Sequence, residues 1–172
     1  MMKPIGNLIE KMADLGGYFS GWLVPLMMIL VVVEVFMRYV MQKPLMIADE
    51  FSAYMLVAIS YLGLAYTWKQ GGHVRITLLV GRLHSSRASW VRLFTLILAF
   101  LFLLSLTQAG YTMIVYALEA DLRSETFFTF PLFWPQLTVF IGFILLTLQL
   151  ALEIVRAIAG IRAGGKVGEK IE

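Results

Sequence analysis

Four long apolar stretches constrain this chain more than any other feature of its sequence. They run over residues 18–40, 49–68, 90–118 and 133–158, and each is bounded by charged residues, proline or glycine. About 20 apolar residues in a helix cross the hydrocarbon of a bilayer, and backbone in lipid must satisfy its own hydrogen bonds. Because four spans are too few for a closed barrel, the sequence predicts a single all-α integral membrane domain over residues 1–172.

Composition excludes several other classes of protein. Hydrophobic residues make up 60% of the chain and charged residues only 15%, whereas about a quarter of an ordinary soluble domain is charged. A soluble fold of this size could not bury so much apolar surface. The chain has no cysteine, which rules out disulfides, thiolate metal sites and cysteine nucleophiles. No basic stripe runs along a soluble face, so no nucleic-acid partner is expected.

The distribution of Lys and Arg predicts the orientation of the spans. Eleven of these residues lie in the N-terminal segment, the central loop and the C-terminal end, and three lie on the other side, namely Arg38, Lys43 and Arg123. Basic residues favour the cytoplasmic side of a membrane. Both termini are therefore expected in the cytoplasm. The first apolar stretch is longer than the core of a signal peptide and no cleavage site follows it, so it is expected to be a retained helix.

Tryptophan marks the predicted ends of the spans. Trp22, Trp68, Trp90 and Trp134 all fall near such an end, where amphipathic rings favour the interface between lipid and water. We expect them to anchor the helices against membrane lipids. The aromatic residues around Trp134 leave open a second interpretation, a docking surface for another chain.

Two charged residues lie inside the first predicted span. Glu34 and Arg38 are four residues apart, so they share a helix face and can pair. A charge within a membrane helix is costly unless it is paired and faces protein or water. Glu34 could serve a proton relay or a clamp to a neighbouring helix, and the clamp is favoured because no second acid lies deep in a span. Glu50, at the start of the second span, is expected to reach Arg38.

The central loop mixes apolar and basic residues. Between residues 73 and 83 this mixture, with Arg75 and Arg82, predicts a short amphipathic helix lying in the membrane surface. Neither histidine of the chain lies within a span, as a haem ligand would, and a zinc site needs about four ligands. His73 is therefore expected to cap the second helix or to contact a partner. No cofactor, metal site or catalytic residue is expected in this chain.

A series of short motifs begins at the end of the first span and continues in a recognisable order into the central loop. They are Arg38-Tyr39, Glu50, Gly63 and Gly72-His73-Val74-Arg75. In order and spacing this series resembles the small membrane subunit (the DctQ-like or Q subunit) of TRAP (tripartite ATP-independent periplasmic) transporters. The family often has Val-Asp after the Arg, and Ile76-Thr77 stands there in this chain, so no role of that acid carries over. Length, span number and orientation fit the family over the whole chain, with Pro135-Gln136 and Gly142 as anchors in the later half.

The resemblance implies a function that composition alone does not give. It implies a non-enzymatic scaffold subunit in the bacterial inner membrane, paired with a large polytopic permease subunit. That subunit would carry an organic-acid-type solute inward, driven by a Na⁺ or H⁺ gradient, and a periplasmic solute-binding protein would deliver the solute. The small subunit would itself hold neither the solute nor the ion. Residues at the motifs and in the first span then become candidate structural or partner contacts: Glu34, Arg38, Glu50, His73 and Arg75.

Two other classes of function remain as alternatives. The chain could be an autonomous small transporter or proton channel that uses Glu34 as its titrating group. It could also be a membrane enzyme or a cytochrome-like four-helix subunit, since helix bundles can hold cofactors between their helices. No pair of histidines within the spans, no cysteine pair and no Ser/His/Asp set supports the second alternative.

Overall fold

Four long helices form the chain in the computed structural model, which describes residues 2–71, 85–126 and 128–162. The helices are α1 (Met2–Tyr39), α2 (Ala48–Lys69), α4 (Ser85–Glu119) and α5 (Phe133–Arg162). Each contains a stretch long and apolar enough to cross a membrane. The predicted all-α architecture with four candidate spans is thereby confirmed. The predicted interfacial helix over residues 73–83, which includes His73 and Arg75, lies outside the described residues.

The first helix begins earlier than the sequence predicts. The predicted span starts near residue 18, after the charged residues Glu10, Lys11 and Asp14, but α1 begins at Met2 and runs without a break through them and through Pro25. Two of these charges pair with neighbouring helices, as described below, so they do not end the helix. Proline is tolerated in membrane helices, where neighbouring groups compensate for the lost hydrogen bond. At 1.5 Å per residue α1 is about 57 Å long, longer than the roughly 30 Å of hydrocarbon.

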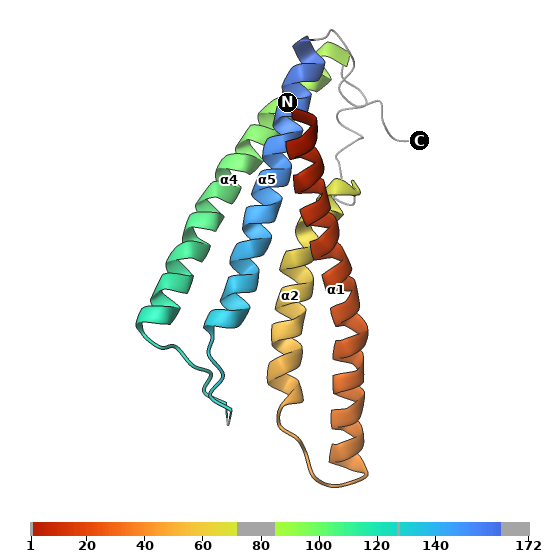
Figure 1. Cartoon of the computed structure of the whole chain (residues 1–172), viewed down its shortest axis with the longest axis vertical. Helices are drawn as coiled ribbons and strands as arrows, with labels where there is room; N and C mark the ends of the chain where they lie inside the picture. The colour runs from red at the N-terminus through yellow and green to blue at the C-terminus, as the bar shows by residue number, and fades with distance from the viewer. Residues whose placement is uncertain (1, 72–84, 127, 163–172) are drawn as a thin grey trace.

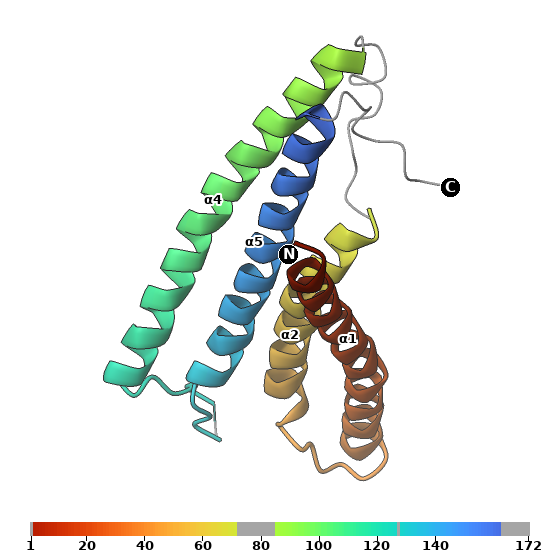
Figure 2. The ribbon, with the colours of Figure 1, turned by 45° about the horizontal axis from the view of Figure 1, so that its top comes forward.

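The helices form two antiparallel hairpins that lie side by side (Figure 1). α1 packs on α2, α4 packs on α5, and the two hairpins meet mainly through α2 and α5. Figure 2 shows α4 and α1 at the two outer edges of this arrangement. We call the end that holds the start of α1 and the end of α5 the terminal end. The opposite end, where residues 40–47 and 120–132 connect the paired helices, is the hairpin end.

α5 is the central helix of the core. Buried residues make up 33% of the most apolar segment of α5, compared with 11% of the corresponding segment of α1. Leu145 of α5 meets Ala13 of α1 and Ala65 of α2 in one cluster, and Leu150, only 1% exposed, packs with Leu103 of α4 in another. Burial therefore falls from the centre outward, and α1 and α4 leave their outer faces uncovered within the chain.

Glycines allow the helices to approach one another closely. A Cβ atom on Gly16 of α1 would lie 2.7 Å from the backbone oxygen of Leu62 on α2, and one on Gly142 of α5 would clash with the backbone oxygen of Tyr61 on α2. Small residues are common at membrane helix interfaces because they let backbones come together where lipid supplies no hydrophobic driving force. The two glycines therefore set the spacing of α1 and α5 on the two sides of α2.

Replacing Gly142 with alanine tests this close packing. The added methyl group meets backbone, which cannot rotate away, so Gly142→Ala should lower the free energy of unfolding by about 1–3 kcal/mol. Thermal unfolding of the purified chain in detergent, followed by circular dichroism, measures this effect. Gly21→Ala is the matched control, because a Cβ atom there meets nothing within 4 Å. Equal melting temperatures for the two variants would contradict the proposed role of Gly142.

Candidate functional site

Charged side chains in the described helices gather in two layers, one at each end of the bundle. Four stretches of helix between the layers carry no Asp, Glu, Lys or Arg: residues 15–33, 51–68, 93–118 and 133–152. Asp14 and Glu34, which bound the first stretch, are separated by about 30 Å of helix at 1.5 Å per residue. This separation equals the thickness of the bilayer hydrocarbon. The layers therefore lie where the charged groups can reach the two membrane surfaces.

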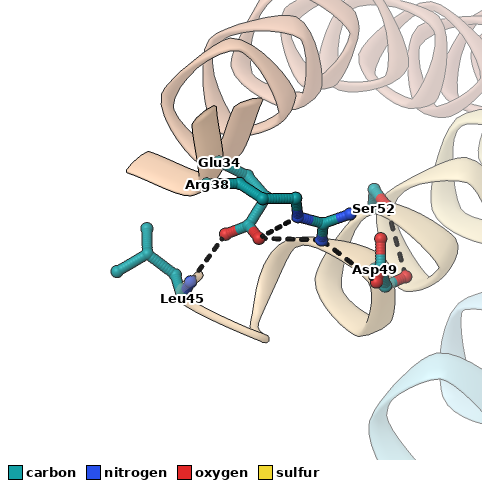
Figure 3. Close-up of polar contacts among 5 residues, drawn as sticks. All are labelled: Glu34, Arg38, Leu45, Asp49 and Ser52. Carbon is teal, nitrogen blue, oxygen red and sulfur yellow. Dashed lines mark hydrogen bonds and ion pairs between the residues drawn. The ribbon is translucent and has the colours of Figure 1, made fainter. Parts of the chain in front are cut away.

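Glu34 is the centre of the layer at the hairpin end (Figure 3). Its side chain is buried. One carboxylate oxygen accepts hydrogen bonds from Nη2 and Nε of Arg38, at 2.9 and 3.2 Å, and the other accepts the backbone N–H of Leu45 at 3.0 Å. Arg38 also lies 3.7 Å from Asp49 at the start of α2. The predicted pair of Glu34 and Arg38 is confirmed, and it fastens the end of α1 to the following loop and to α2.

Glu50 does not reach Arg38, so the expected pairing of these two residues is wrong. Its carboxylate instead accepts a hydrogen bond from the hydroxyl of Tyr54 at 2.6 Å and another from the hydroxyl of Thr126. Asp49, one residue earlier, is the acid that faces Arg38. Consecutive residues in the first turn of a helix point about 100° apart, so only one of the two can face α1. The other faces the second hairpin.

The connection between α4 and α5 brings Thr126 to Glu50. It folds back on itself, because Ser124 N–H bonds to the carbonyl of Phe130 at 2.9 Å and Leu132 N–H bonds to that of Leu122 at 3.0 Å. The Phe130 ring lies 5.5 Å from that of Phe51 and 5.4 Å from that of Tyr54, between ring centroids. An apolar contact and a polar contact thus join this loop to the start of α2. They tie the two hairpins together at the hairpin end.

The layer at the terminal end joins all four helices. Lys69 of α2 bonds to Asp14 of α1 at 2.6 Å, and Arg156 of α5 bonds to Glu10 of α1 at 2.5 Å. Glu153 of α5 takes the indole N–H of Trp68 on α2 at 2.5 Å and Nη2 of Arg92 on α4 at 2.6 Å. Every pair crosses between helices. This network therefore fixes the relative positions of the four helices at the terminal end of the bundle.

The four predicted tryptophan anchors occupy different environments. Trp90 and Trp134 lie close to the first residues of α4 and α5, and both are more than half exposed. Trp22 is also exposed, but it lies in the middle of α1 because the helix begins at Met2, so its expected place at a helix end is wrong. Trp68 turns its indole inward to Glu153. Its principal contacts are therefore within the protein.

Sequence reasoning missed the acids of the terminal end. Glu10, Asp14 and Glu153 stand 146, 55 and 61 residues away from their basic partners along the chain. One signal was available in the sequence. Asp14 and Glu153 lie at the edges of apolar stretches, at the same expected depth in the membrane as the basic residues that end other spans. Such a signal indicates depth in the membrane but not which helices are neighbours. Within the described ranges, no three His, Asp or Glu side chains group as a metal site would require.

Comparison with known proteins places the chain in a family. The family model of the DctQ component of tripartite ATP-independent periplasmic transporters matches residues 27–160, which is 134 of the 172 residues. The chain belongs to the DctQ family. It is therefore a multi-pass membrane protein of a transporter family whose members act as components of multi-subunit complexes. The match covers Glu34 and Glu153, hence residues of both charged layers.

A curated relative gives a second comparison. The chain is 29% identical over 83 residues to a Haemophilus influenzae protein assigned as a TRAP transporter small permease protein. The matched region covers 48% of this DctQ-family chain and 50% of the relative. The chain thus spans about half the length of the curated relative that it matches. The relative agrees with the family model in naming the small permease component.

Removing Glu153 tests the network at the terminal end. Glu153→Ala should lower the free energy of unfolding by about 1.5–3 kcal/mol, because hydrogen bonds to a charged group are among the stronger ones and the variant loses two. Asp121→Ala is the matched control. The Asp121–Arg123 pair is exposed, with 74% and 52% of the two side chains accessible, so its loss should cost less than about 1 kcal/mol. Unfolding of the purified chain in mixed detergent micelles measures both values, and a larger cost for Asp121→Ala would contradict the network's importance.

Proposed function

We propose that this chain is the small scaffold subunit of a secondary-active TRAP transporter that imports an organic-acid-type solute. It would work with a large permease subunit and a periplasmic solute-binding protein. Membership of the DctQ family is the observation that carries this proposal. The large subunit would bind the solute and the coupling ion, Na⁺ or H⁺. This chain would brace that subunit in the membrane.

The distribution of charge supports a bracing role. Pathways for ions and polar solutes are lined by polar and ionisable groups near the middle of the membrane. In the described helices the charged residues lie in the two layers, where Asp14, Glu153 and Glu10 pair with basic residues of other helices and Glu34 pairs with Arg38 of its own helix. Ion pairs and hydrogen bonds join the helices at both ends of the bundle. In the middle, apolar side chains pack together and glycines let the helix backbones come close. A rigid body of this kind is suited to supporting a neighbour that moves.

The proposed orientation follows from the position of the basic residues. The terminal end carries Lys69, Arg92 and Arg156 among the described residues, and the basic termini of the chain lie next to it in sequence. The positive-inside rule places this end in the cytoplasm of a bacterium and the hairpin end in the periplasm. The binding protein would then approach from the hairpin end. The basic segment between α2 and α4 would lie at the cytoplasmic surface, where an amphipathic helix can bind lipid head groups.

Co-purification tests the proposed function. A tagged chain expressed with the large permease subunit of the same transporter should retain that protein through detergent extraction and size-exclusion chromatography. Solute uptake in proteoliposomes should require the chain, the permease and the binding protein together. The control omits this chain alone, and uptake should then fall to background. Full uptake by permease and binding protein without this chain would overturn the proposal.

The alternative of an autonomous proton channel rests on one observation, the buried carboxylate of Glu34. Its bonds to Arg38 and to Leu45 N–H argue for a structural use of that group, because they tie the end of α1 to the connection that leads into α2. We expect Glu34→Gln to leave the proton flux of vesicles containing the purified chain at the level of empty vesicles, as for the unmodified chain. A flux through the unmodified chain that Glu34→Gln abolishes would favour the channel instead.

A further inference from the structure

The two uncovered edges of the bundle differ in chemistry. Along α1, the exposed residues between Tyr18 and Phe36 are apolar or aromatic. Along α4, the exposed side also carries polar side chains, which include Ser105, Gln108 and Thr112. Lipid tails satisfy the first surface fully but offer no partner to the second. The α4 edge is therefore the one that calls for contact with protein.

The polar residues of α4 belong to a regular stripe. Exposed residues recur along it at alternating steps of three and four: Phe94, Leu98, Leu101, Ser105, Gln108 and Thr112. This spacing keeps side chains on one helix face and is the pattern of helix–helix seams. The residues that pack α4 on α5, such as Leu96 and Leu103, lie on the opposite side. We call the six exposed residues the α4 stripe.

Gln108 is the residue of the stripe that most needs a partner. The hydroxyls of Ser105 and Thr112 bond to backbone oxygens four residues earlier in α4, at 3.2 and 3.1 Å. For the Gln108 amide, no hydrogen bond to another described residue is found. Gln108 lies about 24 Å of helix from Arg92 in the terminal-end layer and about 16 Å from Glu119 at the hairpin end. Lipid tails offer no hydrogen-bond partner to an amide at this depth, so a polar side chain from the helix of another protein would stabilise it.

The charge at the end of the stripe argues against a second copy of this chain as the occupant. Glu119 continues the same spacing, seven residues beyond Thr112, and is exposed. Two copies in one membrane have the same orientation, so pairing through this stripe would bring the two Glu119 carboxylates together. Like charges placed opposite one another disfavour such pairing. A different protein can instead place a basic or hydrogen-bonding side chain there.

We propose that the α4 stripe docks a transmembrane helix of the large permease subunit, with Gln108 hydrogen-bonded to a polar side chain of that helix. This inference rests on the proposed function, since it takes its partner from it. The partner helix would carry a polar residue at the depth of Gln108 and a basic or donor side chain near Glu119. The apolar outer face of α1 would then face lipid.

Site-specific photo-crosslinking tests the docking face. A benzophenone side chain at Leu101 in the stripe, in membranes that also contain the permease, should give an adduct with the mass of this chain plus the permease. The same group at Ile29, exposed on α1, is the control and should give no such adduct. An adduct of twice the mass of this chain from position 101, or an adduct with the permease from position 29 alone, would overturn the proposal.

A second measurement isolates the amide of Gln108. Gln108→Leu should weaken binding of the permease by about threefold, the effect of an average hydrogen bond between membrane helices. Thr95→Val is the matched control, because Thr95 is exposed on α4 outside the stripe and bonds to its own backbone. Equal affinities for the two variants would contradict the role of Gln108. If the permease co-purifies with the chain but neither crosslinks from position 101 nor responds to Gln108→Leu, the docking face is wrong while the proposed function stands.

Discussion

Lipid cannot solvate a charged side chain, and this constraint organises the whole structure. Between the two layers the described helices are free of charged residues over about 30 Å of length. Charges are confined to the ends of the bundle, where each of the buried or half-buried ones finds a partner on another element or within its own turn. The same groups that mark the membrane boundaries therefore also fasten the helices.

Contacts at both ends of the bundle join the two hairpins, whose outer faces are uncovered within the chain, into one body. At the terminal end, Glu153 alone links three helices through Trp68 and Arg92. At the hairpin end, Glu50 joins α2 to the loop between α4 and α5 through Thr126. Between these ends the helices approach on glycines, which gives close backbone contact with little side-chain volume. Such a body keeps its shape while leaving two edges open for lipid or for a partner.

The position of Glu34 changes how the chain is understood. As a lone acid in a predicted span it is compatible with proton transfer, and the sequence leaves that alternative open. In the structure the chain turns back after α1, so that Leu45 and Asp49 come beside the last turns of the helix and complete the contacts of Glu34 and Arg38. The acid thus belongs to the boundary of the membrane and to the connection between α1 and α2. This use of Glu34 agrees with the bracing role proposed above for this chain.

The sequence by itself determined the number of spans, the all-α class, the family and the pairing of Glu34 with Arg38. Each of these depends on residues close together in the chain: apolar runs long enough to cross lipid, a local order of motifs, and two charges one helical turn apart. Only the tertiary structure decided that α1 extends to Met2, that Glu50 faces Thr126 instead of Arg38, and that Glu153 joins Trp68 to Arg92. Hydropathy fixes how deep a residue lies in the membrane, but which helices are neighbours, and how each is rotated, depends on packing between segments far apart in the chain.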